Sequence, residues 1–426
     1  MERKVHVMMG KLPRYQDIVN TLSTRSKVGQ LFMPAAFIND TEAHVQALEN
    51  LIREQHIGGL CFFHSPQSAA TNFEGTREVP YHPDSLQRLK ELIDRYQQAA
   101  PYPLLMAMDA EWGLAMRVER TPRYPYSLTL GALGADSNPL IYEVGLRMAA
   151  DCRDAGIHWN LSPVIDINSH PENPVISYRS FGNRPETVVS KSLQILRGFQ
   201  DGGILSCVKH FPGHGDTAVD SHLELPVLNK ETEALEAEEF IPFRELIKAG
   251  VPAVMTGHLS VPPLDPSGLP ASLSEKIIGV LRRELGFEGA IVTDALNMQA
   301  LSRIDSRPEQ LNLMAVEAGN DMLCFASEIP QSIDLILGVL SESRLEASFQ
   351  RVWKLKESVF RTNTPAITSR YTPEKLNWEL ARRSLCEISK GSTSPLPWME
   401  GITSLLYYGE RPDVFTDRVG EPKMNA

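Results

Sequence analysis

The sequence predicts a (β/α)8 barrel of the TIM type with a short C-terminal extension. Eight short apolar or β-branched runs recur along the 426 residues. Successive runs lie about 30 to 50 residues apart, which leaves room for one helix and its loops, as in a parallel sheet with outer helices. The runs are GQLFMP from Gly29, IGGLCFF from Ile57, PLLMAMD from Pro103, IHWNLSPVID from Ile157, ILSCVKHF from Ile204, PAVMTGH from Pro252, GAIVTDA from Gly289 and NDMLCF from Asn320.

Polar residues at the ends of these runs favour the barrel over an open doubly wound sheet, which is the competing α/β arrangement. A closed eight-stranded barrel places its catalytic groups at the C-terminal ends of its strands. The residues at these ends are Asp109, Asp166, Lys209, His210, His258 and Asp294.

Amphipathic segments between the runs predict the outer helices. SLQRLKELIDRYQQA after Asp84 carries its apolar residues at helical spacing, and EALEAEEFIPFRELIKAG ends at Gly250, a typical helix C-cap. EASFQRVWKLKESVF and PEKLNWELARRSLCEI predict two helices after the last strand. We expect the barrel to occupy residues 1–365.

The remaining residues, 366–426, predict a helix, the linker-like KGSTSPLP and one strand, ITSLLYYGE from Ile402. A single strand cannot bury both of its faces. The tail must therefore dock on the barrel, pair with a partner or begin a domain that is incomplete here.

Composition excludes several classes of function. The chain has 42 basic and 53 acidic residues, a net charge of -11, which disfavours binding to nucleic acid or anionic lipid. The sequence contains no run of about 18 apolar residues, the length needed to span a bilayer, and MERKVHVMMGKLPRY lacks a signal-peptide core, so we expect a soluble cytoplasmic protein.

The cysteines form no CxxC pair, which favours core thiols over disulfides or a zinc knuckle. The cysteines are Cys61, Cys152, Cys207, Cys324 and Cys386.

The densest group of ionisable residues follows the fifth run, in VKHFPGHGDTAVDSHLELP at residues 208–226. Such a cluster is costly for folding, so a function is the better explanation. One interpretation is a metal site, because His and Asp bind first-row metals. The other is a proton shuttle, in which Asp220 orients the imidazole of His222. The ionisable members are Lys209, His210, His214, Asp216, Asp220 and His222.

Three smaller groups of polar residues are further candidates for catalysis or substrate binding. Asp294 ends a strand and is either a catalytic carboxylate or an N-cap for the helix expected in ALNMQAL. Asp109, Glu111 and Arg117 surround Trp112, as a structural Glu111–Arg117 ion pair or as a sugar-binding lip. Arg179 either forms a structural interaction that joins two parts of the chain or binds a substrate oxygen.

These motifs together resemble the β-N-acetylglucosaminidases of glycoside hydrolase family three. The resemblance rests on KHFPGHGDTAVDSHLELP, with RSFG about 30 residues before it and VTDALNM about 70 residues after it, and covers roughly residues 20 to 360. It implies Asp294 as nucleophile, His222 as acid/base and Asp220 as its assistant. It also implies substrate contacts from Asp109, Arg117, Arg179, Lys209 and His210, with no cofactor and no metal.

The same resemblance implies retaining hydrolysis of terminal β-linked N-acetylglucosamine from peptidoglycan- or chitin-derived oligosaccharides. The chain departs from the family's usual pattern at Trp112, where a glycine is usual, and at Ala295, where a second acidic residue is usual. About 60 residues beyond the barrel are too few for the α/β sandwich domain of many relatives. Two alternatives stay open: a phosphorylase, because a neutral histidine does not repel phosphate, and a catalytically silent sugar-binding barrel.

Overall fold

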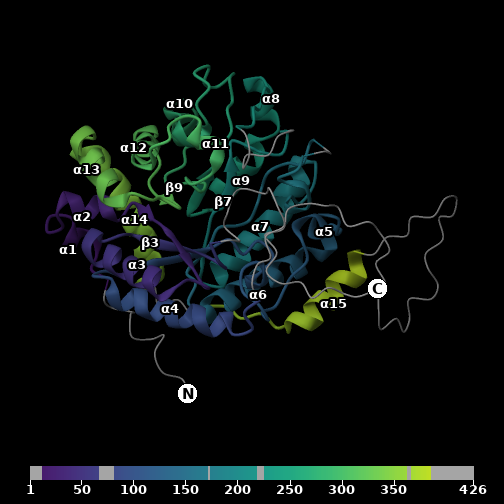
Figure 1. The fold of residues 1–426 in the computed structure, drawn as a ribbon. Coiled ribbons are helices and arrows are strands. Elements are labelled where there is room, and N and C mark those ends of the chain that lie inside the picture. Colours follow the sequence, from purple (N-terminus) through teal and green to yellow (C-terminus); the bar gives the residue numbers. More distant parts are fainter. Residues whose placement is uncertain (1–11, 67–80, 171–172, 218–224, 362–365, 385–426) are drawn as a thin grey trace, which may run out of the picture.

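The computed structural model describes residues 12–66, 81–170, 173–217, 225–361 and 366–384 (Figure 1). All strand pairs within these ranges are parallel. The strands are β1 (Phe32–Met33), β2 (Ala35–Phe37), β3 (Gly59–Phe63), β4 (Leu105–Met108), β5 (Trp159–Asn160), β6 (Leu205–Ser206), β7 (Val208–Phe211), β8 (Ala253–Thr256), β9 (Ala290–Thr293) and β10 (Leu323–Cys324).

The strands close into a ring of eight positions. Pairing runs from β2 through β3, β4 and β5 to β6, from β7 through β8 to β9, and from β10 to β1. Single bridges between Val164 and Lys209 and between Val292 and Met322 join these groups. The first predicted run contains β1 and ends at Pro34, directly before β2, and the fifth run contains both β6 and β7. The eight predicted runs therefore mark the eight positions, with the first strand extending three residues beyond its run. The predicted barrel is confirmed.

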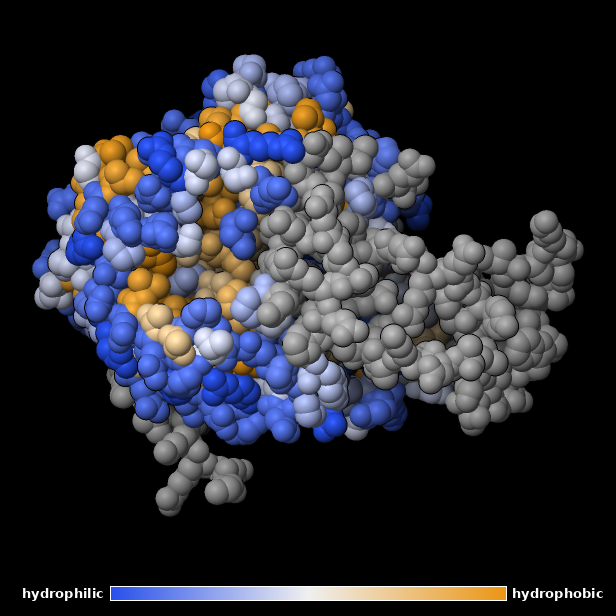
Figure 2. Space-filling model, viewed as in Figure 1, coloured by the Kyte–Doolittle hydropathy of each residue, from blue (hydrophilic) through white to orange (hydrophobic). Residues whose placement is uncertain are grey.

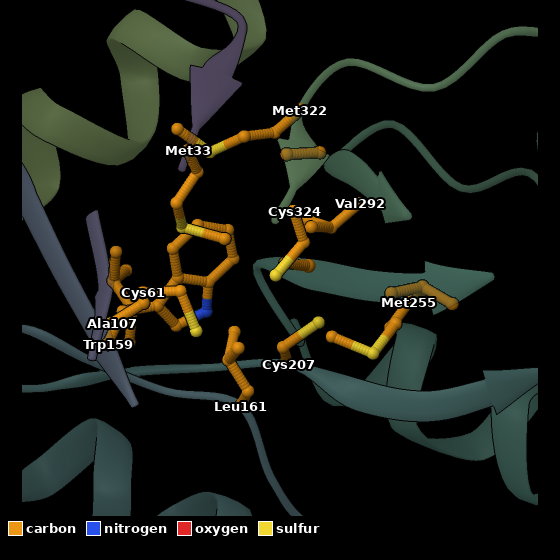
Figure 3. Packing of buried hydrophobic residues seen from close by; sticks show 14 of the residues in the cluster. Met33, Cys61, Ala107, Trp159, Leu161, Cys207, Met255, Val292, Met322 and Cys324 are labelled. Atoms are coloured by element: carbon orange, nitrogen blue, oxygen red, sulfur yellow. The ribbon is translucent and has the colours of Figure 1, made fainter. Parts of the chain in front are cut away.

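Side chains fill the inside of the barrel, so it is a packed core and not a pore. Figure 3 shows Trp159 beside the sulfur atoms of Met33, Cys61, Cys207 and Cys324. The indole Nε1 of Trp159 donates to the carbonyl oxygen of Ser206 at 3.2 Å, which satisfies its only polar atom. A binding site is therefore expected at the C-terminal ends of the strands and in the loops that follow them.

Four of the five cysteines are buried free thiols, as expected. Burial raises the pKa of the Cys152 and Cys207 thiols well above the ordinary value, so they are unreactive core groups. Cys386 lies outside the described residues.

Helices cover the barrel on its outside (Figure 1). The predicted helix after Asp84 is confirmed as α4, with Leu89, Leu92 and Ile93 buried. The α-helices are α1 (Tyr15–Ile18), α2 (Thr24–Gly29), α3 (Glu42–Gln55), α4 (Ser85–Ala99), α5 (Ser127–Gly131), α6 (Asn138–Ala155), α7 (Pro185–Asp201), α8 (Thr232–Ala237), α9 (Phe240–Lys248), α10 (Glu275–Gly279), α11 (Gln299–Ser302), α12 (Pro308–Ala318), α13 (Ile329–Val339), α14 (Glu342–Phe360) and α15 (Pro373–Ser384).

The single helix predicted to end at Gly250 is wrong in one respect, because it is two helices, α8 and α9. The chain turns at Glu238, whose φ and ψ are -130° and -78°. Pro242 has no backbone N–H, and its ring would clash with the carbonyl of Glu238, four residues earlier, so one continuous helix cannot pass this point. Lys230 contacts Glu238 and the buried Glu239 at 2.7 and 2.8 Å. Gly250 has a φ of +80°, as expected of a C-cap glycine.

The described part of the C-terminal extension docks on the barrel. Helix α15 packs against α5 and α6, with Leu376 and Leu380 buried (Figure 1). Asn377 Nδ2 donates to the carbonyl oxygen of Arg123 at 2.7 Å. The strand predicted from Ile402 lies outside the described residues, and the boundary at residue 365 stays a prediction.

The outer surface is mostly hydrophilic, with local hydrophobic areas such as the one where α13 lies (Figure 2). There, Leu335 and Val339 are exposed on successive turns of the helix. Among the described helices, none is long and apolar enough to cross a membrane.

Candidate active site

The loops at the C-terminal ends of the strands gather most of the predicted site residues. Lys209 and His210 belong to β7, and Asp294 directly follows β9. Asp109 follows β4, while Arg117 and Arg179 lie further along the loops after β4 and β5. Asp220 and His222, the predicted acid/base pair, lie outside the described residues and stay predictions.

A buried carboxylate, Glu111, connects the predicted substrate contacts. Arg179 donates to it twice, from Nε to Oε2 at 2.9 Å and from Nη2 to Oε1 at 2.7 Å. Lys209 Nζ lies 2.9 Å from Glu111 Oε1 and donates to Asp109 Oδ1 at 2.7 Å. The side chains of Glu111 and Lys209 are both 3% exposed. Such bidentate, charge-assisted bonds fix the orientation of Arg179.

Electrostatics keeps this network ionised. Burial would raise the pKa of the Glu111 carboxyl, but Arg179 and Lys209 outweigh that effect and hold the pKa well below its usual range. Burial would lower the pKa of Lys209, yet the carboxylates of Asp109 and Glu111 raise it above its ordinary value. The mouth of the barrel therefore carries fixed positive groups close to fixed carboxylates, an arrangement suited to binding sugar hydroxyls.

The Glu111–Arg117 ion pair considered from the sequence is wrong, because Glu111 pairs with Arg179 and Lys209 instead. Arg117 Nη2 lies 3.6 Å from Asp109 Oδ2. Its guanidinium carbon lies 4.0 Å from the centre of the Phe63 ring, so a cation–π contact supports this buried arginine.

An aromatic cluster lies next to this network, formed by Trp112, Tyr126 and Tyr178. The ring centres of Trp112 and Tyr126 are 5.0 Å apart, and those of Tyr126 and Tyr178 are 4.4 Å apart. Trp112 follows Glu111 in the chain and Tyr178 precedes Arg179, so the Glu111–Arg179 pair brings the two aromatic side chains together. Tyr126 and Tyr178 are partly exposed.

The nucleophile candidate Asp294 is held by its own turn. Its Oδ1 accepts from the N–H of Ala295 at 2.8 Å, and its N–H donates to the carbonyl oxygen of Thr256 at 3.0 Å. His258 Nε2 lies 3.0 Å from the carbonyl oxygen of Ala295. Burial would raise the pKa of Asp294, but His210, His258, the Ala295 N–H and Lys209 together hold it well below its usual range. Asp294 is therefore an ionised carboxylate.

The N-cap interpretation of Asp294 is wrong. The next helix, α11, begins at Gln299, and its N-cap residue is Met298. The carboxylate of Asp294 instead binds the neighbouring N–H, which leaves it beside the mouth of the barrel.

Two further residues of the site, Asp166 and His258, lie at strand ends where the sequence alone indicates no role for them. Asp166 is fully buried and its carboxylate binds His210 and His214. His258 supports the turn after Asp294, with Nδ1 2.7 Å from Ser272 Oγ. A polar residue at a strand end is a candidate site residue in the sequence. The bonding partners of Asp166 and His258 come from other loops, so the sequence alone does not show these partners.

A metal site was the other interpretation of the histidine-rich loop. Among the residues that the structure describes, no group of three or more His, Cys, Asp or Glu side chains is arranged to hold a metal ion. The described histidines have other surroundings: His214 Nδ1 lies 2.9 Å from Thr217 Oγ1, and burial together with His210 lowers the pKa of His214 to about 4.

Comparison with known proteins shows the family of this chain. Residues 23–355 match the glycosyl hydrolase family 3 N terminal domain. Beta-hexosaminidase A of Pseudoalteromonas piscicida is 31% identical over 382 residues, which are 82% of this chain and 62% of that protein. A beta-hexosaminidase of Alkalilimnicola ehrlichii is 36% identical over 259 residues, 59% of this chain and 73% of that one.

A solved structure is also similar, that of a glycoside hydrolase family 3 beta-N-acetylglucosaminidase from Paenibacillus. It has a TM-score of 0.72 and 33% identity, and the match covers 85% of this chain and 69% of that one. The family model covers more than half of the chain. The chain therefore belongs to glycosyl hydrolase family 3.

Proposed function

We propose that this chain is a retaining β-N-acetylglucosaminidase, which removes terminal β-linked N-acetylglucosamine from chitin- or peptidoglycan-derived oligosaccharides. The observation that carries the proposal is the ionised Asp294 directly after β9, whose pKa is lowered in part by Lys209, a member of the network of Asp109, Glu111, Arg179 and Lys209. A retaining glycosidase needs a carboxylate nucleophile that is ionised and close to groups that fix the sugar. The names of the relatives support the choice of sugar.

The proposed reaction proceeds in two steps. Asp294 attacks the anomeric carbon while protonated His222 donates its proton to the leaving oxygen. Neutral His222 then takes a proton from water, and the water oxygen displaces Asp294, so the β configuration is retained. Asp220 favours the imidazolium form of His222 and orients its ring. The roles of His222 and Asp220 rest on the sequence motif.

The proposed substrate contacts are Asp109, Arg117, Arg179, Lys209 and His210. Asp109 accepts from sugar hydroxyls, and the cations donate to sugar oxygens. Because Lys209 and Arg179 are themselves fixed by Glu111, these donors need no rearrangement when the sugar binds.

Two nitrophenyl substrates test the sugar. We expect faster turnover of nitrophenyl β-N-acetylglucosaminide than of nitrophenyl β-glucoside, measured as kcat/KM. A preference for the glucoside would overturn the acetamido assignment.

The same reactions run with and without phosphate test the acceptor. We expect free N-acetylglucosamine in both, whereas sugar 1-phosphate would support the phosphorylase alternative.

The aromatic cluster of Trp112, Tyr126 and Tyr178 is proposed as the sugar-binding lip, because flat apolar faces complement the CH groups of a sugar ring. Tyr126→Leu removes the flat ring, and we expect it to raise KM about five- to tenfold, on the scale of an aromatic contact worth about 1 kcal/mol. Tyr126→Phe keeps the ring and is the matched control, with KM close to that of the parent. Equal KM values for the two variants would remove the cluster from the binding site.

A further inference from the structure

Asp166 has the most complete set of partners of any carboxylate at the mouth of the barrel that the structure describes. It follows β5, and its side chain is 0% exposed. Its Oδ2 lies 2.7 Å from His210 Nδ1, and the N–H of His210 donates to both oxygens at 3.1 and 3.2 Å. Its Oδ1 also accepts from the N–H of His214 at 2.7 Å.

These bonds fix the orientation of the His210 ring. A buried carboxylate only accepts hydrogen bonds, so Nδ1 of His210 carries a proton whether the ring is neutral or charged. The other nitrogen, Nε2, then lies 3.5 Å from Arg179 Nη2, among the proposed substrate contacts. The two N–H bonds from the backbone hold the Cα of His210 in place, so the ring has little freedom to turn away.

Asp166 is tied to the neighbouring substrate contacts as well. The hydroxyl of Ser180, next to Arg179, donates to the Asp166 carbonyl oxygen at 2.6 Å. The N–H of Ile165, the preceding residue, donates to the carbonyl oxygen of Lys209 at 2.9 Å. A single residue therefore joins the loop of Arg179 to the strand of Lys209 and His210.

A buried carboxylate needs such compensation, because a charge without partners in the interior is costly. Burial would raise the pKa of Asp166, but His210, His214 and the N–H of His214 lower it below its usual value. Asp166 is thus ionised, and both of its carboxylate oxygens already accept hydrogen bonds from His210 or His214. No acceptor position is left for a substrate or for an acid/base step.

We propose that Asp166 is a positioning residue, which acts on the reaction through His210 by holding Nε2 of that ring toward the terminal sugar. This inference rests on the proposed function, in which His210 contacts the substrate. It assigns no chemical step to Asp166. Asn at this position keeps an oxygen for the backbone N–H groups, but its NH2 group cannot accept from Nδ1–H, so the ring must turn or change tautomer.

A double-mutant cycle tests the proposal. We expect Asp166→Asn to lower kcat/KM by about 10- to 100-fold, the usual effect of losing a group that orients a functional histidine. His210→Ala should cause a loss of similar size, and the double variant should lose no more than about twofold beyond His210→Ala, because both changes remove the same interaction. Losses that multiply would overturn the proposal.

A matched control separates positioning from general stability. Asp321 is also a fully buried, multiply bonded aspartate, with Arg282, Ser348 and Arg351 as partners, and it lies before β10, away from the C-terminal loops. Asp321→Asn should lower the melting temperature but leave kcat/KM per folded molecule unchanged. A comparable kcat/KM loss in Asp321→Asn would mean that Asp166 is merely structural.

Histidine ¹⁵N NMR of the unsubstituted protein provides a measurement that does not depend on variant folding. We expect His210 to carry a proton on Nδ1 at every pH at which the protein is folded, and a ring protonated on Nε2 alone would overturn the proposal. The cycle is run on whichever nitrophenyl glycoside the protein cleaves. A preference for the glucoside would then overturn the proposed sugar while the role of Asp166 is still measured.

Discussion

Replacing Asp294 with asparagine is expected to lower kcat by about 10⁴-fold or more, because the change removes the nucleophile of a double displacement. Asparagine has nearly the same shape and can still accept from the N–H of Ala295, so the turn after β9 should persist. The loss should therefore appear in kcat, with little change in the melting temperature. Initial rates on nitrophenyl β-N-acetylglucosaminide and a thermal melt measure the two effects.

A matched control for this variant is Asp305→Asn. Within the described part of the chain, Asp305 pairs with Arg307 in the segment between α11 and α12 and contacts none of the proposed site residues, so its replacement should leave kcat unchanged. A fluorinated glycosyl inhibitor provides an independent check, since it should label a single peptide at Asp294. Label on another residue, or an Asp294→Asn variant with the parent's rate, would remove Asp294 from the nucleophile role. If the protein were a catalytically silent sugar-binding barrel, neither the parent nor the Asp294→Asn variant would turn over the substrate.

The low pKa of Asp294 also has a consequence for the pH profile. Burial raises it, but His210, His258, the N–H of Ala295 and Lys209 outweigh burial, so the carboxylate stays ionised to a pH below the usual range near 4. A fall in kcat/KM on the acid side that begins near pH 4 or above therefore comes from another group. The Asp294 carboxylate is available over the whole neutral range.

The positions of the strands and of most site residues could be predicted because they are local properties of the sequence. Each strand is a short apolar run, and the polar group at its end, such as Asp109, Lys209 or Asp294, is marked by its contrast with that run. Closure of the barrel follows from the number of runs. None of these inferences needs to know which side chains meet.

Partnerships between loops could not be predicted. Glu111 and Arg179 are 68 residues apart in the chain, and only the path of the loops after β4 and β5 brings them together. Asp166 and His210 are 44 residues apart. Proximity in the sequence suggests Arg117 as the partner of Glu111, which is not the partner found in the fold. The break between α8 and α9 is a different case, because Pro242 in the first turn of α9 is a local signal for it. The acid/base pair of Asp220 and His222 stays a prediction from the motif.

Glu111 should be the most important residue of the site for stability. Glu111→Gln leaves the cations of Arg179 and Lys209 without their shared carboxylate, where the side chains of Glu111 and Lys209 are only 3% exposed and that of Arg179 is 18% exposed. Breaking a buried ion pair from one side typically costs about 3 to 5 kcal/mol, because it leaves uncompensated buried charge. We therefore expect a loss of about 3 kcal/mol in the free energy of unfolding, measured by urea denaturation at neutral pH.

The exposed pair of Glu245 and Lys248 on α9 gives a matched comparison, with exposures of 40% and 65%. Glu245→Gln should change the free energy of unfolding by less than about 0.5 kcal/mol, since exposed pairs contribute little. A Glu111→Gln variant as stable as Glu245→Gln would mean that Lys209 and Arg179 are compensated by Asp109 and other groups, and that Glu111 is not required to hold them.

The difference in the free energy of unfolding between the parent and Glu111→Gln should also depend on pH, in a direction that the pKa of Glu111 determines. The pKa of Glu111 is lower in the folded than in the unfolded chain, because Arg179 and Lys209 outweigh the opposing effect of burial. Its contribution is therefore complete above the unfolded value near 4.3 and is lost as the pH falls from there through the folded value. The gap in stability between the parent and Glu111→Gln should be constant from pH 8 to about pH 5 and should narrow in more acidic solution. A gap that instead widens with acid would show that Glu111 is protonated in the folded protein, and the ionised network around Arg179 and Lys209 would then have to be rejected.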